Sequence, residues 1–175
     1  LKKYGNLEYL EGDLLNLKDI KTVFEKYDIS CVFHFAAFSQ VAESVKNPRK
    51  YYQNNVIGTL NLLNTMLDFD VLKIVFSSTA ATYGEPKYIP IDEFHSQNPI
   101  NPYGQTKFMI EKILDDYDKA YGLKSVRLRY FNVIGADKNS RIGEWHNPET
   151  HLVPNILKST FEKGRVFEMY GTDYD

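Results

Sequence analysis

Cysteine is almost absent from this chain of 175 residues, which contains one, Cys31. A single cysteine cannot form a disulfide within the chain, so a scaffold held together by disulfides is excluded. Cys31 lies in the apolar run at residues 31–35. That setting favours a small core residue in a reducing compartment over a reactive thiol. The sequence therefore predicts a cytoplasmic protein.

Long apolar runs and blocks of like charge are also missing. No apolar run approaches the roughly 20 residues that a membrane-spanning helix needs. The formal net charge is −2, and no basic cluster stands out. Nucleic acid and anionic membranes are therefore disfavoured as partners. With 43% hydrophobic and 25% charged residues, the chain has the composition of a globular domain with a sizeable core.

Strand-like and helix-like segments alternate along the chain. Two Asn-Pro pairs, at Asn47 and Asn101, each offer a capping side chain followed by proline at the first helical position, and Gly122 suits a helix end. This alternation predicts an α/β fold with a doubly wound parallel sheet of Rossmann type. The expected strands are residues 7–10, 31–35, 73–76, 125–130 and 166–170, and the expected helices are 18–27, 49–69, 102–121 and 153–162.

The ends of the expected strands are small and polar. Ligands of open parallel sheets bind beyond the carboxyl ends of the strands. Here those ends are residues 12–13, 36–37, 77–79 and 131–132, of which 77–79 read Ser-Ser-Thr. We expect the hydroxyls of residues 77–79 to face the ligand crevice, although serine and threonine also cap turns in many proteins.

Tyr103 and Lys107 are the most telling pair of residues. On a helix they lie about 40° apart, on the same stripe as Ile110 and Leu114. An ammonium group beside a phenol favours the phenolate and lowers the pKa of the tyrosine, which can then exchange protons with a sugar hydroxyl. Chance alone produces this spacing often, with a packed tyrosine and a snorkelling lysine. The order of a strand, a hydroxyl-rich strand end, a loop and then this Tyr-Lys pair is much less common by chance than the pair alone.

Many motifs in the same order make the chain similar to the extended short-chain dehydrogenase/reductase family. Within that family it most resembles the nucleotide-sugar 4-epimerases that interconvert UDP-glucose and UDP-galactose. The resemblance covers residues 7–175. Its motifs are residues 11–13, 34–37, 51–59, 76–84, 101–107, 129–132, 149–154 and 170–171.

The resemblance implies a role for each matching position. Tyr103 is expected to be the catalytic base and acid, Lys107 to tune it and hold the nicotinamide ribose, and Thr79 to assist proton transfer at the sugar O4. The other cofactor contacts implied are Asp13, Leu14, Phe35, Ala36, Ala37, Asn54, Ser77 and Tyr130. The other substrate contacts implied are Asn132, His151, Leu152 and Tyr170.

The implied reaction is a reversible oxidation at C4 of a UDP-hexose through a transient 4-keto sugar, with NAD as a bound cofactor that is regenerated. Residues 1–132 are expected to be a partial NAD-binding domain, and residues 133–175 the start of the substrate-binding region. The glycine-rich phosphate-binding turn is not found, and the chain opens on Leu1 rather than methionine. Both ends therefore look cut from a longer protein, and this piece alone is expected to be inactive.

Three other functions were weighed against a UDP-hexose 4-epimerase. Nucleotide-sugar 4,6-dehydratases place an Asp-Glu pair after the strand-end threonine, whereas this chain has Ala80-Ala81. A 4-epimerase of an N-acetylhexosamine or pentose nucleotide remains possible. A non-catalytic NAD(H)-binding module is less consistent with a chain that keeps the tyrosine, the lysine and the hydroxyl. No metal is expected, because the four histidines show no zinc-like spacing.

Members of the family often dimerise through two long helices, which match residues 49–69 and 102–121. The first of these is expected to bury Tyr52, Val56, Leu60, Leu63 and Leu67. Both helices carry more apolar residues than one buried face needs, so a homodimer is expected. The surplus residues include Leu62, Met66, Phe108 and Ile113.

Overall fold

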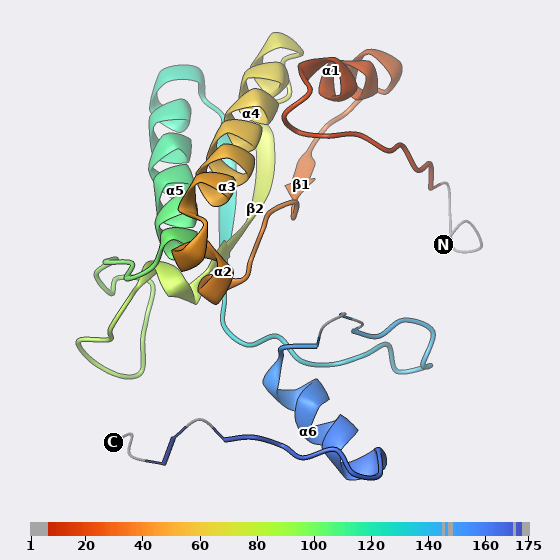
Figure 1. Cartoon of the computed structure of the whole chain (residues 1–175). Coiled ribbons are helices and arrows are strands. Elements are labelled where there is room, and N and C mark those ends of the chain that lie inside the picture. The colour runs from red at the N-terminus through yellow and green to blue at the C-terminus, as the bar shows by residue number, and fades with distance from the viewer. Residues whose placement is uncertain (1–6, 145, 147–148, 170, 173–175) are drawn as a thin grey trace. The chain divides into compact units, whose positions relative to one another are not determined.

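The structure is a computed structural model that describes residues 7–144, 146, 149–169 and 171–172. The chain divides into two compact units, Leu1–Phe131 and Asn132–Asp175, and each is described by itself. The first unit contains a parallel sheet of the order β1-β2-β3, as expected from the alternating pattern (Figure 1). Its strands are β1 (Val32–His34), β2 (Lys73–Thr79) and β3 (Lys124–Tyr130).

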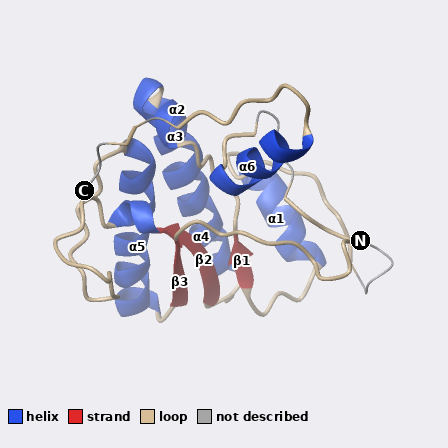
Figure 2. Ribbon diagram, turned by 90° about the horizontal axis from the view of Figure 1, so that it is seen from below, coloured by secondary structure: helices blue, strands red, loops and turns tan. Residues whose placement is uncertain are grey.

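The helices of the first unit cover one face of this sheet. Ile74 and Phe76 project from β2 into a core formed with side chains of α1, α4 and α5 (Figure 2). On the opposite face, Phe33, Val126 and Leu128 are exposed. The helical segments are α1 (Leu17–Lys26), α2 (Val41–Lys46), α3 (Pro48–Tyr51), the π-helix η2 (Tyr52–Ile57), α4 (Gly58–Asp68), the 3₁₀-helix η3 (Ala80–Thr82) and α5 (Pro102–Tyr121).

The limits of α5 follow from its capping residues. The Asn101 side chain accepts a hydrogen bond from the amide of Gly104 at 2.8 Å, and Pro102 occupies the first turn. At the other end Gly122 adopts the left-handed conformation with φ 74°, which glycine enters without steric penalty. The predicted limits of this helix are confirmed. Because α5 carries Tyr103 and Lys107, these caps also fix where both side chains enter the fold.

The expected core stripe of the helix at residues 49–69 is confirmed at Val56 and Leu63, which are buried. It is wrong at Tyr52, which is half-buried, as are Leu60 and Leu67. Tyr51 and Val56, five residues apart, are both buried, whereas Tyr52 is half-buried. The cause is η2, because a π-helical turn contains about one residue more than an α-helical turn and shifts the phase of the helix. From Leu62 onward the buried side chains are Leu62, Leu63, Thr65 and Met66.

Two expected strands do not form. Residues 7–10 and 166–169 are neither strand nor helix, and residue 170 lies outside the described residues. A strand is defined by ladder bonds to a neighbour, and neither segment has such a partner among the described residues. The second unit contains the expected helix as α6 (Leu152–Phe161). No helix of the described residues is both long enough and apolar enough to traverse a membrane.

Candidate active site

Lys107 lies on the buried face of α5, as its spacing predicts. Its side chain is almost fully enclosed, and its ammonium group donates a hydrogen bond of 2.7 Å to the carbonyl of Ser77 at the end of β2. The same ammonium lies 4.8 Å from the centre of the Phe76 ring. A buried ammonium needs such partners, because leaving one unpaired is costly. Among the described residues, Ser77 is its only hydrogen-bond acceptor, so further donor capacity remains.

Thr79 brings the strand end and α5 together. Its side chain is hydrogen-bonded to Tyr103 and also accepts the amide of Ala81, which caps η3. Close approach of the two segments depends on Gly104, since a Cβ atom there would lie 2.5 Å from the carbonyl oxygen of Ala81. The glycine after Tyr103 therefore lets the first turn of α5 pack against the turn that follows Thr79.

The pKa of Tyr103 departs from the sequence-based expectation. Burial raises it, and the hydrogen bond with Thr79 offsets only part of that effect. Lys107 is directed to the Ser77 carbonyl, and burial lowers its own pKa to about 8. The expected lowering of the tyrosine pKa by Lys107 is thus wrong for the protein without ligands, because desolvation of the phenol dominates.

The backbone of Tyr103 is held at both ends by buried side chains that the sequence analysis missed. Its amide donates to Ser44 Oγ at 3.2 Å, and its carbonyl accepts from Thr106 Oγ1 at 2.7 Å. Thr106 in turn accepts a bond from Asn55 Nδ2 at 3.2 Å. Asn55 also bonds the amide and the carbonyl of Phe38. A buried asparagine in an apolar helical stripe is unfavourable unless its amide group is hydrogen-bonded. The presence of Asn55 in such a stripe was therefore the signal in the sequence that could have revealed this network.

His34 is a neutral histidine beneath the site. Its Nε2 lies 2.8 Å from the hydroxyl of Thr59, and that hydroxyl donates its one proton to the Asn55 carbonyl. Nε2 must therefore carry the proton that bonds to Thr59. Burial, followed by the nearby charge of Lys107, lowers the pKa of His34 to about 4. Protonating His34 would place a second positive charge beside the buried lysine.

We expect this histidine to make the folded state sensitive to mild acid. The ordinary pKa of histidine, 6.5, applies to the unfolded chain, and the lowered pKa of about 4 applies to the folded chain. Between these two pH values the unfolded chain binds a proton that the folded chain does not. The free energy of unfolding should therefore fall over this range, by up to about 3 kcal/mol. Urea unfolding between pH 4 and 7 measures this. The variant His34→Gln should lose most of this slope. An unchanged slope in His34→Gln would contradict the assignment.

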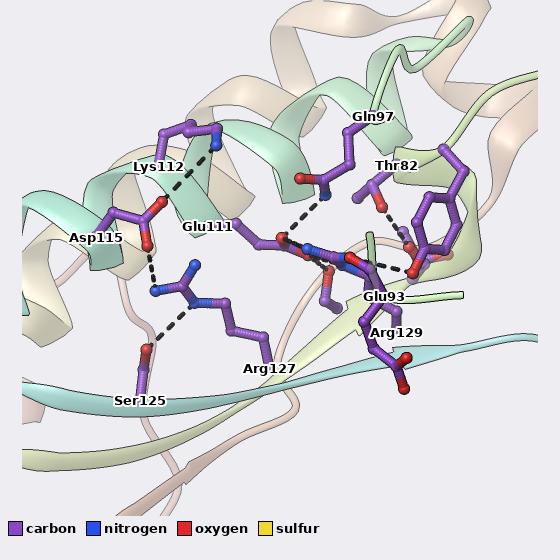
Figure 3. Close-up of polar contacts among 12 residues, drawn as sticks. Thr82, Glu93, Gln97, Glu111, Lys112, Asp115, Ser125, Arg127 and Arg129 are labelled. Carbon is purple, nitrogen blue, oxygen red and sulfur yellow. Dashed lines mark hydrogen bonds and ion pairs between the residues drawn. The ribbon is translucent and has the colours of Figure 1, made fainter. Parts of the chain in front are cut away.

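A buried carboxylate joins α5 to the ends of β2 and β3. Glu111 accepts bonds from Arg129 Nη2 at 2.7 Å, Gln97 Nε2 at 2.9 Å and Ser78 Oγ (Figure 3). Burial acts to raise the pKa of Glu111, but these hydrogen bonds outweigh it and leave the pKa lowered. The expectation that Ser78 faces the ligand crevice is wrong, because alternation along β2 turns its side chain to the helix face. Arg129 also donates to the hydroxyl of Tyr83 at 3.0 Å.

Most residues expected to contact the cofactor lie at the carboxyl edge of the sheet. The β1–β2 register pairs His34 with Phe76, so the segment after β1 continues beside the end of β2. Thr79 pairs with Tyr130 on β3. Asn54 is half-buried and donates to the Asn55 side chain at 3.0 Å. The structure brings to this edge the expected residues Phe35, Ala36, Ala37, Ser77 and Tyr130.

Asp13 and Leu14 lie on the segment that precedes α1, and Leu14 packs against the start of α4, where a Cβ atom on Gly58 would lie 3.0 Å from the Cβ atom of Leu14. The Asp13 carboxylate accepts the amide of Leu15, and the Leu14 carbonyl accepts from Asn61 of α4. Both residues line a cavity of about 970 Å³ between this segment, α1 and β1, which Cys31 also lines. Tyr103 and Lys107 do not line it. The structure therefore does not bring Asp13 and Leu14 into contact with the Tyr103–Lys107 pair.

Three of the expected substrate contacts lie in the second unit. Asn132 is exposed at its start, and His151 occupies the N-cap position of α6. Leu152 lines a cavity of about 370 Å³ together with Asn155 and Arg165. Tyr170 lies outside the described residues.

The fold and the site together define a class of protein. A parallel α/β sheet with small residues at its carboxyl edge is a nucleotide-binding architecture. A helix at that edge presents a tyrosine bonded to a strand-end threonine, with a buried lysine one turn later. This arrangement is that of the short-chain dehydrogenase/reductase class.

Comparisons with known proteins agree with this class. The family model described as GDP-mannose 4,6 dehydratase matches residues 1–169, so the chain belongs to that family. The chain is 52% identical over 168 residues to a UDP-glucose 4-epimerase of Lactobacillus helveticus, covering 96% of this chain and 51% of the relative. It is 49% identical over 173 residues to one of Rhizobium meliloti, covering 99% and 52%. The chain thus spans about half the length of these relatives.

Solved structures give the same result. The UDP-glucose 4-epimerase from Brucella ovis in complex with NAD matches with a TM-score of 0.92 and 48% identity, over 96% of this chain and 52% of that protein. The enzyme from Bifidobacterium longum in complex with NAD⁺ and UDP matches with a TM-score of 0.75 and 42% identity, over 77% and 41%. Within its family, the chain is therefore similar to UDP-sugar 4-epimerases.

Proposed function

We propose that the full-length protein interconverts UDP-glucose and UDP-galactose at C4, with NAD as a bound cofactor. The observation that supports this most is the hydrogen bond between Thr79 and Tyr103, with the buried Lys107 one turn further along the same helix. A positioned phenol with a neighbouring hydroxyl can exchange a proton with a sugar hydroxyl. The names of the relatives, of whose length this chain spans about half, support the choice of substrate.

The residues present suit a dinucleotide. Ala36 and Ala37 leave room for close approach at the sheet edge, and Lys107 has donor capacity beyond its bond to Ser77. When bound, NAD supplies a hydride acceptor for C4 of the sugar. In this proposal residues 1–132 form the NAD-binding part. The residues that would hold the cofactor are Asp13, Leu14, Phe35, Ala36, Ala37, Asn54, Ser77, Tyr103, Lys107 and Tyr130.

The proton step then belongs to this chain's own side chains. Tyr103 takes the proton from the sugar O4, with Thr79 as the neighbouring hydroxyl, and returns it when the 4-keto sugar is reduced on its other face. Burial holds the phenol protonated in the protein without ligands, so added positive charge near Tyr103 should promote its deprotonation. The remaining substrate contacts would be Asn132, His151, Leu152 and Tyr170.

A 4,6-dehydratase activity, which the name of the family model suggests, is disfavoured by the residues after Thr79. Elimination of water needs an acid next to the sugar, and this chain places Ala80 and Ala81 there, within η3. Neither methyl group can donate a proton. The geometry of the Thr79 turn is therefore compatible with oxidation and reduction at C4 but supplies no elimination acid.

The substrate is tested by incubating the full-length protein with UDP-galactose in the absence of added reductant. We expect UDP-glucose to form. Parallel reactions contain UDP-N-acetylgalactosamine and a UDP-pentose. Conversion of one of these without conversion of UDP-galactose would redirect the proposal to another UDP-sugar. Binding of NAD without conversion of any of the three would favour a non-catalytic NAD(H)-binding module.

A homodimer remains part of the proposal, but one argument for it fails. Leu62 and Met66, expected to be surplus apolar residues, are buried in the core of the first unit. Ile113 packs against the same core. Of the four residues named, only the half-buried Phe108 remains as possible interface surface. The mass of the full-length protein in solution tests the dimer.

A further inference from the structure

The loop that leads into α6 gathers four side chains that can bind a metal ion. Glu144, His146, Glu149 and His151 each offer one ligand atom, and these atoms all lie within 4.8 Å of one another. The two imidazole rings are 4.5 Å apart. The sequence analysis expected no such arrangement, because the residues follow neither a helical period nor a zinc-finger spacing. They lie on described residues before α6 and at its N-cap instead.

The separations between these atoms lie on either side of those in a small tetrahedral site. Zinc bonds to imidazole nitrogen and carboxylate oxygen at about 2.0–2.2 Å, which gives ligand-to-ligand distances of about 3.3–3.6 Å. The Glu144 carboxylate oxygen lies 3.3 Å from His146 Nδ1 and 3.1 Å from His151 Nδ1. The Glu149 oxygens lie 4.0 Å from His146 Nδ1 and 2.9 Å from His151 Nδ1. Small side-chain adjustments would therefore seat one ion.

Two of the four ligands are held in place by α6. The Glu149 side chain is only 3% exposed, and its carboxylate accepts the amide of His151 at 2.9 Å. Asn155 donates its side chain to the Glu149 carbonyl and its amide to the His151 carbonyl. Arg165 Nη2 in turn donates to the Asn155 side chain at 2.9 Å. Supporting contacts of this kind fix the orientation of metal ligands.

The charge and chemistry of the group favour one class of ion. Two carboxylates face two imidazoles, and Lys158, at 4.0 Å from Glu149, is the only lysine or arginine that forms an ion pair with either carboxylate in the described residues. The remaining negative charge would attract a divalent cation. Imidazole nitrogen suits zinc and its neighbours in the first transition row, whereas magnesium and calcium prefer sites built wholly from oxygen.

We propose that Glu144, His146, Glu149 and His151 form a zinc-binding site that fastens the loop to the start of α6. Four protein ligands leave no open coordination position, which is the pattern of a structural site. The proposal does not rest on the proposed epimerase activity and concerns the second unit alone. For the His151 side chain, it replaces the substrate contact proposed above.

The test is a titration of the full-length protein, stripped of metal with a chelator, with zinc chloride. Calorimetry should show one zinc ion bound per chain. His146→Ala and Glu144→Gln should each weaken binding about tenfold or more. The control Lys163→Gln removes an exposed charge of the same unit and should bind zinc as the parent does. Cobalt in place of zinc should give the intense visible absorption of tetrahedral coordination.

Several results would overturn the site. One is that the metal-free protein binds no zinc. Another is that the double variant His146→Ala/His151→Ala binds zinc as tightly as the parent. Magnesium binding as tight as zinc binding would also contradict it, because the two imidazoles would then contribute nothing. Circular dichroism of each variant verifies that weaker binding reflects loss of a ligand and not of the fold.

Discussion

Replacing Tyr103 by phenylalanine is expected to slow epimerisation by the full-length protein about 10²–10⁴-fold, the usual contribution of general acid–base catalysis. The phenol is the group that would exchange the proton of the sugar O4, and Thr79 bonds to it. Phenylalanine keeps the ring and removes only the hydroxyl. Because the backbone of residue 103 is held by Ser44 and Thr106, the turn should keep its shape. Conversion of UDP-galactose to UDP-glucose measures the effect.

The matched control for this prediction is Tyr121→Phe. It removes a hydroxyl from the far end of the same helix, where the side chain is 57% exposed. We expect near-parental turnover from Tyr121→Phe and retained NAD binding in both variants. If Tyr103→Phe turned over at the parental rate, Tyr103 would have no place in the mechanism. If it lost NAD as well, its role would be to hold the cofactor.

Replacing Arg129 by methionine is expected to lower the free energy of unfolding by about 3–5 kcal/mol, the range for removing one partner of a buried ion pair. The Glu111 side chain is 1% exposed and would keep its charge without its cation. Figure 3 shows a matched control on the same strand and helix. There Arg127 pairs with Asp115 at 2.7 Å, with side chains 23% and 36% exposed. Arg127→Met should lower the free energy of unfolding by only about 0–1 kcal/mol.

Urea unfolding of the two single variants and of the double variant Arg129→Met/Glu111→Gln completes this test. Removing the charge of Glu111 as well should restore part of the stability lost in Arg129→Met, since no unpaired carboxylate then stays buried. Equal losses in Arg129→Met and Arg127→Met would contradict the view that Glu111 and Arg129 form the buried link between α5 and β3.

Local signals in the sequence were sufficient for much of this structure. Asn101, Pro102 and Gly122 define α5 through capping and a left-handed turn, and both effects act within a few residues. The position of Lys107 on the buried face follows from helical period alone. The parallel sheet follows from the alternation of apolar runs and helices.

Features that depend on contacts between distant segments were not predictable in this way. The π-helix η2 shifts the buried face by one residue, and no pattern in residues 52–57 announces it. Asn55 acquires its role from Phe38 and Thr106, which lie on other segments. The raised pKa of Tyr103 depends on how deeply the fold buries the phenol. Residues 7–10 look like a strand but find no neighbour in the described chain to pair with.

One measurement tests the proposed function most directly. UDP-galactose carrying deuterium at C4 is incubated with the full-length protein and NAD in ordinary water. The account predicts UDP-glucose with the deuterium still at C4, because the hydride leaves and returns within the same site while Tyr103 exchanges only the O4 proton. Loss of the deuterium to solvent, or absence of any conversion, would contradict it.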